Sequence, residues 1–225
     1  MTSCDYAVVI HQISNTKTFL SFLDIPIPMQ LWENINMLRV QFLNFWENMD
    51  TVKNLTAALF FTALVTLGAK IRLYTPFTPV PFTLQTFFIF TASLYLRKHW
   101  SSVAIGFYLL IGLLGIPVFA GDGSGLTYLL GATGGYLLAF LLVPPFISRM
   151  FRKFEYSWFS AFTASVLGAN LILAIGSLYL GLYIGNIPRG FALGFLPFVG
   201  VELAKAIGAA GAAKMLFPRI RGAGK

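Results

Sequence analysis

The chain has 225 residues, of which 57% are hydrophobic and 11% are charged, whereas a soluble domain carries about 25% charged residues. Such a chain cannot cover a soluble core with polar surface, so we expect an integral membrane protein. Its formal net charge of +8 then follows from basic residues in its loops and does not require a nucleic-acid partner. The single cysteine, Cys4, excludes an intramolecular disulfide and a cysteine-rich metal site.

The first 53 residues do not resemble a secretory signal, because acidic residues are spread through them and no clean apolar core follows an early basic cluster. Their apolar residues indicate short amphipathic helices on the membrane surface, separated at the Ile-Pro-Ile-Pro run of residues 25–28. The alternative is a disordered leader. We therefore expect three parts: a leader at 1–53, a membrane domain at 54–217 and a basic cytoplasmic tail at 218–225.

Six stretches of the chain approach the roughly 20 apolar residues that a membrane-spanning helix needs. The second stretch is short and would extend into the residues before it, and the fifth contains no Lys, Arg, Asp or Glu. The sequence therefore predicts an all-α membrane protein with six transmembrane helices. These helices are expected at residues 54–73, 82–96, 102–119, 126–147, 158–188 and 193–217.

Basic residues indicate the orientation of these helices. The loops after the second and fourth helices and the C-terminal end together hold nine Lys and Arg residues, whereas the opposite side holds Lys70, Arg72 and Arg189. Since basic residues gather on the cytoplasmic side, we expect both termini in the cytoplasm. The segments 79–85 and 120–125 then face outward, where a substrate from outside would meet them first.

A proline-rich segment, Pro-Val-Pro-Phe-Thr-Leu-Gln at residues 79–85, stands between two hydrophobic runs without charge. Pro76, Pro79 and Pro81 cannot donate backbone hydrogen bonds. Within a membrane, such broken backbone survives only inside protein or beside a cavity. We therefore expect this segment to line a solute cavity, with Thr83 and Gln85 as candidate binding residues.

Glu202 and Lys205 are the strongly ionisable residues that lie well inside a predicted membrane helix. A charge at that depth costs about 2.5–3.5 kcal/mol on insertion scales, and such residues mark pathways or sites. Their i, i+3 spacing places both on one face of the helix. In the functional interpretation, Lys205 meets a ligand anion and Glu202 accepts hydrogen bonds from ligand N–H groups. The alternative is a mutually satisfied ion pair near the outer end of the helix.

Other polar side chains within the apolar runs are weaker candidates. The Gly-Ala-Thr-Gly-Gly-Tyr run at residues 131–136 provides hydroxyl groups on Thr133 and Tyr136, and Tyr108 stands within the third predicted helix. The run is not a phosphate loop, because no Gly-Lys-Ser/Thr follows it. The alternative roles are close helix packing, with Tyr136 as an interfacial anchor and Tyr108 as a packing residue.

No constellation of residues predicts catalysis or metal binding. His11 and His99 are far apart and have no metal-ligating companions, and the chain lacks a Ser–His pair, paired carboxylates, an HExxH pattern and a Walker motif. We therefore expect no enzyme activity, no cofactor and no metal, and any ATP hydrolysis would need a partner protein.

Four motifs in order resemble one protein family. They are PVPFTLQ at residues 79–85, YLLIGLLGIPVF at 108–119, GATGGY at 131–136 and PFVGVELAK at 197–205. Together, over about residues 55–217, they resemble the BioY family, the biotin-specific substrate-binding S-components of energy-coupling factor (ECF) transporters. The resemblance implies the six-helix ECF S-component fold in the cell membrane and a biotin site near the outer face.

The resemblance also implies partners and a set of binding residues. The partners are an energising module of a transmembrane coupling protein and two ATPases, or further copies of the chain if it acts alone. Glu202 with Thr or Gln side chains can satisfy the ureido group of biotin, and Lys205 can meet its carboxylate, although the sequence does not decide which end faces Lys205. The implied biotin-binding residues are Thr83, Gln85, Tyr108, Thr133, Tyr136, Glu202 and Lys205.

The chain departs from the family pattern at three places. Glu202 stands where the family usually has an aspartate, and Ala132 stands where it has a proline. S-components commonly carry an Ala-x-x-x-Ala docking pattern on the first helix, and the nearest match here is Ala58-x-x-x-Thr62. Two alternatives stay open on the sequence: an S-component for another vitamin, and a structural or assembly membrane protein without a small ligand.

Overall fold

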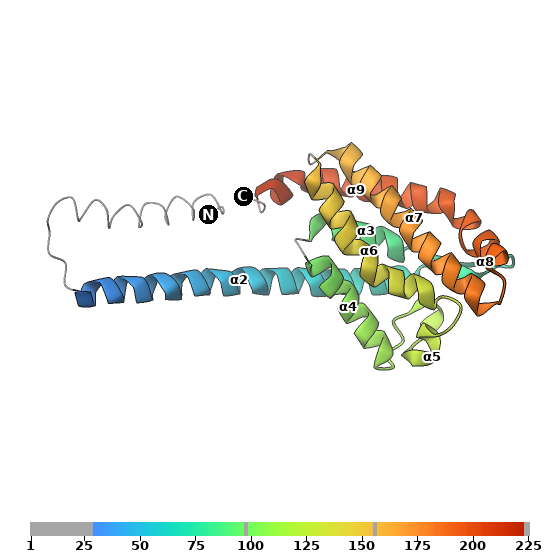
Figure 1. Cartoon of the computed structure of the whole chain (residues 1–225), viewed down its shortest axis with the longest axis horizontal. Coiled ribbons are helices and arrows are strands. Elements are labelled where there is room, and N and C mark those ends of the chain that lie inside the picture. Colours follow the sequence, from blue (N-terminus) through green and yellow to red (C-terminus); the bar gives the residue numbers. More distant parts are fainter. Residues whose placement is uncertain (1–28, 97–98, 155–156, 223–225) are drawn as a thin grey trace. The chain divides into compact units, whose positions relative to one another are not determined.

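The computed structural model describes residues 29–96, 99–154 and 157–222 of the chain. It divides the chain into two compact units, of which one is Asn54–Leu216 and the other comprises residues 1–53 with 217–225. Figure 1 shows the order of the elements, which are mainly helices. The expectation for residues 1–28 of the leader lies outside the described residues, and the three-part division of the chain stays a prediction.

The first described element is the long helix α2, Met29–Lys70. No glycine or proline stands between Met29 and Leu67, so nothing in the sequence interrupts the helix. Its part Thr51–Lys70 is long and apolar enough to cross a membrane. The chain is therefore already helical over residues 29–53, ahead of the predicted first membrane helix.

The proline-rich segment forms a β-hairpin and does not enter a helix directly. Strand β1, Arg72–Thr75, pairs antiparallel with β2, Thr78–Thr83, and Arg72 lies opposite Thr83. Pro79 and Pro81 stand two residues apart, so both nitrogens point to the same side of β2, and a two-stranded ribbon leaves one side of each strand without a partner. The all-α expectation is corrected to a mainly helical fold with one hairpin.

The second and third predicted membrane helices are shorter than expected. Helix α3, Gln85–Tyr95, has 11 residues because the hairpin occupies the residues before it. Helix α4, Trp100–Leu113, has 14 residues and ends ahead of Pro117, and the turn after it places Gly115 at a φ of 94°, where a side chain would be strained. Neither helix reaches the roughly 20 residues of a full membrane crossing.

The predicted fourth helix is divided into two. After the 3₁₀ turn Ala120–Asp122 comes the short helix α5, Gly125–Leu129, and a turn separates it from α6, Gly134–Lys153. The glycine-rich run at 131–136 thus bends the chain and then begins α6. The long helix of this region, α6, therefore begins and ends later in the chain than the predicted helix at residues 126–147.

The last part of the chain is helical with two short interruptions. Helix α7, Trp158–Tyr183, begins after Ser157, whose Oγ accepts a hydrogen bond from the Ser160 N–H. Helix α8, Ile187–Gly194, a 3₁₀ turn at Leu196–Phe198 and α9, Val199–Gly222, follow. Among the described residues, four helical stretches are long and apolar enough to span a membrane, and not six: Thr51–Lys70, Gly134–Lys153, Trp158–Tyr183 and Ile187–Met215.

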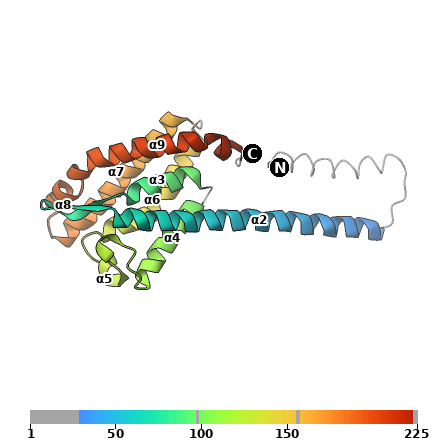
Figure 2. The same cartoon turned by 180° about the vertical axis from the view of Figure 1, so that it is seen from behind.

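Close packing of α6 on α7 forms the centre of the Asn54–Leu216 unit. In both views α6 lies in the middle of the helices with α7 beside it (Figures 1 and 2). The ring of Tyr136 lies directly over Gly176, and the side chain of Ile147 lies over Gly168, where any added Cβ atom would overlap them. Small residues therefore let the two helices approach closely.

The small-residue pair on α2 faces into the bundle. Ala58 is fully buried in a cluster with Ala92 and Ala104, and the Thr62 hydroxyl donates to the Ala104 carbonyl at 2.9 Å. The nearest match to the docking pattern of S-components is thus used for internal packing between α2, α3 and α4.

Candidate functional site

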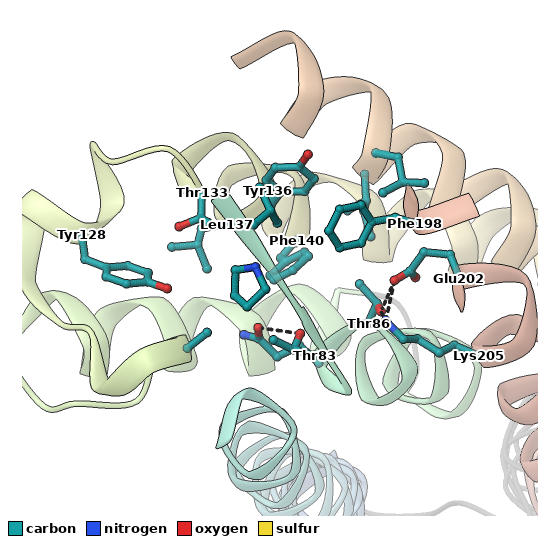
Figure 3. Close-up of a pocket in the computed structure, with 16 residues that line it drawn as sticks. Thr83, Thr86, Tyr128, Thr133, Tyr136, Leu137, Phe140, Phe198, Glu202 and Lys205 are labelled. Atoms are coloured by element: carbon teal, nitrogen blue, oxygen red, sulfur yellow. Dashed lines mark hydrogen bonds and ion pairs between the residues drawn. The ribbon is translucent and has the colours of Figure 1, made fainter. Parts of the chain in front are cut away.

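A small cavity of about 50 Å³ lies between the hairpin, α3, α6, α7 and α9. Most of its walls are apolar, and its polar groups gather in a few places (Figure 3). Six of the seven residues predicted from the sequence line it, and the seventh, Tyr108, lies behind the wall. The lining residues are Val80, Pro81, Thr83, Gln85, Thr86, Ala120, Tyr128, Thr133, Tyr136, Leu137, Phe140, Ile172, Leu173, Phe198, Glu202 and Lys205.

Glu202 and Lys205 form a buried ion pair on one side of the cavity, and Thr86 joins it. Lys205 Nζ lies 2.5 Å from Glu202 Oε1, and the side chains are only 9% and 5% exposed for lysine and glutamate. The Thr86 hydroxyl donates to Glu202 Oε1 and accepts from Lys205 Nζ, each at 2.9 Å. Both charges thus have partners, which a buried charge requires.

The other carboxylate oxygen of Glu202 has no hydrogen-bond partner among the described residues. Oε2 is buried, while Oε1 receives hydrogen bonds from both Thr86 and Lys205. A buried acceptor without a donor costs about 1–3 kcal/mol, and more when it is charged. The protein therefore supplies hydrogen-bond donors to one carboxylate oxygen of Glu202 only, and Oε2 is an acceptor available to a ligand N–H group.

A second polar chain runs from Thr83 to Tyr108. Thr83 Oγ1 donates to Gln85 Oε1 at 3.0 Å, and Gln85 Nε2 donates to Tyr108 Oη at 2.6 Å. Tyr108 is fully buried and packs edge-on against Phe119. Tyr108 therefore orients the Gln85 amide from behind the cavity wall, a supporting role that the sequence did not distinguish from direct binding.

Tyr128 and Thr133 lie on the side of the cavity away from Glu202 and Lys205 (Figure 3). Burial raises the pKa of Tyr128, and a hydrogen bond with Thr133 opposes that shift. Tyr136 also lines the cavity, but its hydroxyl is engaged, because it donates to the Gly194 carbonyl at 2.9 Å. This side therefore offers neutral hydroxyl groups and no charge of its own.

Ion pairs tie the loop after α4 to the end of α2, through Lys70, and to the hairpin, through Arg72. Lys70 Nζ bonds to Asp122 Oδ1 at 2.6 Å and to the Pro117 carbonyl at 2.5 Å, and Arg72 Nη2 lies 3.4 Å from Asp122 Oδ2. The hydrogen bond from Lys70, followed by that from Arg72, lowers the pKa of Asp122. Because Ala120 in this loop and Thr83 on the hairpin both line the cavity, the ion pair between Arg72 and Asp122 connects two of its walls.

The sequence did not identify several residues that line the cavity. Thr86 follows Gln85 directly and is polar within an apolar helix, a signal that could have marked it. Phe198, which stacks on Phe82 at 4.3 Å between ring centroids, had no such signal, because aromatic residues are common throughout membrane helices. Among the described residues, no group of three or more His, Cys, Asp or Glu side chains is placed to hold a metal ion.

Comparisons with known proteins identify a family that this chain resembles. The family model described as "BioY family" matches residues 38–222, a longer range than the motifs covered. A biotin transporter BioY from Thermotoga maritima is 39% identical over 160 residues, which cover 71% of this chain and 92% of the relative. Biotin transporter BioY2 from Lactococcus lactis subsp. cremoris is 40% identical over 155 residues, covering 66% and 85%.

A solved structure also has a similar fold. It is a crystal structure of the S-component for biotin from an ECF-type ABC transporter, with a TM-score of 0.72 and 26% sequence identity. The match covers 76% of this chain and 94% of the other. The overall fold of this chain is thus similar to that of this S-component for biotin.

Proposed function

The chain belongs to the BioY family, and from that membership we propose that it is a biotin transporter, acting as the substrate-binding S-component of an ECF transporter. It is a multi-pass membrane protein and a transport component, not an enzyme. The observation that supports biotin best is the buried Glu202–Lys205–Thr86 group, with one unpaired carboxylate oxygen, in a mainly apolar cavity.

The chemistry of biotin complements these groups. Its ureido group has two N–H donors and one carbonyl acceptor, its fused rings and valeryl chain are apolar, and its far end is a carboxylate. We place the ureido group at the ion pair: an N–H donates to Glu202 Oε2, and the ureido oxygen accepts from Lys205 Nζ. This arrangement satisfies the buried acceptor that the protein leaves open.

Charge supports this orientation over its reverse. Glu202 and Lys205 together are neutral, and a neutral ureido group leaves them so. A carboxylate at the same place would add an uncompensated buried negative charge beside Glu202, which is strongly unfavourable. In this proposal Lys205 donates hydrogen bonds to the ureido oxygen and to Glu202, and the ligand carboxylate lies toward Tyr128 and Thr133.

The cavity must enlarge when biotin binds. Ligand sites typically have volumes of about 300–1,000 Å³, whereas this cavity measures about 50 Å³. The hairpin and the loop at residues 114–124 carry lining residues without belonging to the long helices, and we place the movement there. Opening would therefore separate these outer segments while α6 and α7 stay packed.

Biotin binding to the purified protein tests the proposal. Titration calorimetry should show binding to the wild type, and Glu202→Ala and Lys205→Ala should each weaken it at least about tenfold, or about 1.4 kcal/mol. Lys214→Ala, on an exposed position of the same helix, is the matched control and should bind normally. Unchanged affinity in both site variants would remove these residues from the site.

A ligand panel tests the choice of vitamin. A ligand at 100 times its dissociation constant stabilises a protein by about 2.7 kcal/mol, so biotin alone among the vitamins tested should raise the melting temperature. A shift with another vitamin would assign a different substrate. No shift with any vitamin would favour a structural role, in which Glu202 and Lys205 only pair with each other.

For the topology we propose six crossings with both termini in the cytoplasm, in which the short helices α3 and α4 complete the crossings made by the four longer stretches. The excess of basic residues on one side supports this orientation. Single cysteines at Ser124 and Lys153, in a variant without Cys4, should react with an impermeant thiol reagent from outside and from inside, respectively. Labelling of both from the same side would contradict the topology.

For the partners we propose an energising module of one transmembrane coupling protein and two ATPases, as the S-component role implies. Association of several copies without a module is the other arrangement. Biotin uptake by a biotin-auxotrophic cell, measured with and without a co-expressed module, separates the two. Uptake that needs the module supports the first arrangement, and equal uptake without it supports the second.

A further inference from the structure

We propose that Arg72 binds the carboxylate of the ligand at the outer mouth of the cavity, as a second anchor opposite the Glu202–Lys205 pair. This inference rests on the proposed function and goes beyond it, because neither the sequence motifs nor the cavity lining includes Arg72. It makes Arg72 a specificity-determining residue that distinguishes free acids from neutral esters and amides.

The distribution of charge points to the mouth. Among the residues that line the cavity, Glu202 and Lys205 carry the charges, and they cancel. Beside the cavity, the described ion pairs join Lys70, Arg72 and Asp122, which leave one surplus positive charge, and we take this side as the mouth. A ligand with a neutral polar head and a single negative charge therefore fits in one orientation only, with its head at the Glu202–Lys205 pair and its negative charge beside Arg72.

The hairpin places Arg72 next to the cavity. Arg72 lies directly opposite Thr83 in the strand pairing, so the two side chains stand on the same face of the ribbon within about 5 Å between Cβ atoms. Thr83 lines the cavity. A ligand chain that passes Thr83 therefore reaches the guanidinium group.

Arg72 is better placed for this role than Lys70. Lys70 Nζ already has two close acceptors, Asp122 and the Pro117 carbonyl. Arg72 contacts Asp122 at 3.4 Å, near the limit for a hydrogen bond, and its side chain is 27% exposed. When Arg72 turns to a ligand, Asp122 keeps Lys70 as its partner, and a guanidinium group can bind a carboxylate with two parallel hydrogen bonds.

The surroundings of Arg72 favour an anion. Its guanidinium lies 5.6 Å from the ring centroid of Tyr74. The positive charge of Arg72 also acts on Tyr128, a cavity-lining residue, and opposes the rise of its pKa that burial causes. We therefore place the carboxylate between the guanidinium group and the neutral hydroxyl of Tyr128.

Biotin and biotin methyl ester, which differ only in the charge of this end, test the proposal with purified full-length protein. The wild type should bind biotin at least about tenfold more tightly than the ester, which is about 1.4 kcal/mol. Arg72→Gln should weaken biotin binding by about the same factor and leave ester binding within about twofold. Arg189→Gln, which removes another exposed basic residue from the side predicted to face outward, should change neither affinity.

Each other outcome is informative. A wild type that binds neither ligand refutes the proposed function itself, whereas a wild type that binds both equally refutes only the role of Arg72. An Arg72→Gln variant that loses both ligands to the same extent while folded, or loses neither, also overturns it. If that variant does not fold, the salt dependence of the wild type decides: added salt should weaken binding of biotin and not of the ester, and equal effects on both would refute the proposal.

Discussion

Replacing Glu202 alone should destabilise this protein more than replacing Glu202 and Lys205 together. Glu202→Gln removes the counter-ion that lies 2.5 Å from Lys205 Nζ, and the lysine side chain is only 9% exposed. Removing one partner of a buried ion pair costs about 3–5 kcal/mol, because the remaining charge is left buried without compensation. For a protein of this size about 2–4 °C of melting temperature corresponds to 1 kcal/mol, so the expected decrease is about 6–20 °C.

The double variant Glu202→Gln, Lys205→Met removes both charges and keeps similar side-chain volumes. The glutamine oxygen still accepts the Thr86 hydroxyl, and the methionine occupies the space of the lysine stem. Replacing a buried ion pair by groups of similar size is often neutral or stabilising. The double variant should therefore melt within about 4 °C of the wild type, which is roughly 1 kcal/mol, yet bind biotin at least about tenfold more weakly.

Thermal unfolding in one detergent without ligand, with biotin titration on the same samples, measures both properties. Lys214→Met, on an exposed position of α9, controls for the loss of a lysine by itself. Contacting residues should show an interaction energy, whereas independent sites add within about 0.3–0.5 kcal/mol. If the double variant loses as much stability as the sum of Glu202→Gln and Lys205→Met measured singly, Glu202 and Lys205 do not act as a buried pair and the reasoning is refuted.

Two further predictions concern packing and pH. Gly176→Ala places a methyl group against the Tyr136 ring, so it should lower the free energy of unfolding by about 1–3 kcal/mol, measured by thermal unfolding. Gly200→Ala is the control and should be nearly neutral, because an added Cβ there meets nothing within 4 Å. Equal effects of the two substitutions would contradict the close packing of α6 and α7. The hydrogen bond from Lys70 lowers the folded-state pKa of Asp122, so its stabilising effect is present above the unfolded-state pKa and is lost as the pH falls through the folded value. The difference in melting temperature between wild type and Asp122→Asn should therefore be constant down to about pH 4 and shrink below it, and a difference that already shrinks near neutral pH would argue against the ion pair.

The composition of the chain and the free-energy cost of burying charge in a membrane predicted the class of the protein and two residues of its candidate site. The small share of charged residues identified a membrane protein, and the expense of a charge within a membrane helix singled out Glu202 and Lys205, which the structure brings together at one side of the cavity. The boundaries of the helices were less accessible. Hydropathy continues through the turns before α3 and after α4, so apolar residues alone could not show where α3 begins or where α4 ends.

The hairpin illustrates what pairing adds. Pro79 and Pro81 indicated backbone that could not be an ordinary helix, and the expectation of a cavity there agrees with the lining by Thr83 and Gln85. The partner strand, Arg72–Thr75, has no pattern of its own that predicts a strand. A strand of four residues is stable only when another strand satisfies its backbone groups, so its existence depends on the neighbour and not on its own sequence.

The sequence by itself determined the class of the protein and the pair of charges that the membrane makes costly, because both follow from composition and from spacing along one helix. Only the tertiary structure decided the rest of the site. Thr86 stands 116 positions before Glu202, yet its hydroxyl lies between the two charges, and Arg72 lies opposite the cavity-lining Thr83 only because β1 pairs with β2. Hydrogen bonds act over about 3 Å, so a site built from distant segments forms only when the helices and the hairpin have packed.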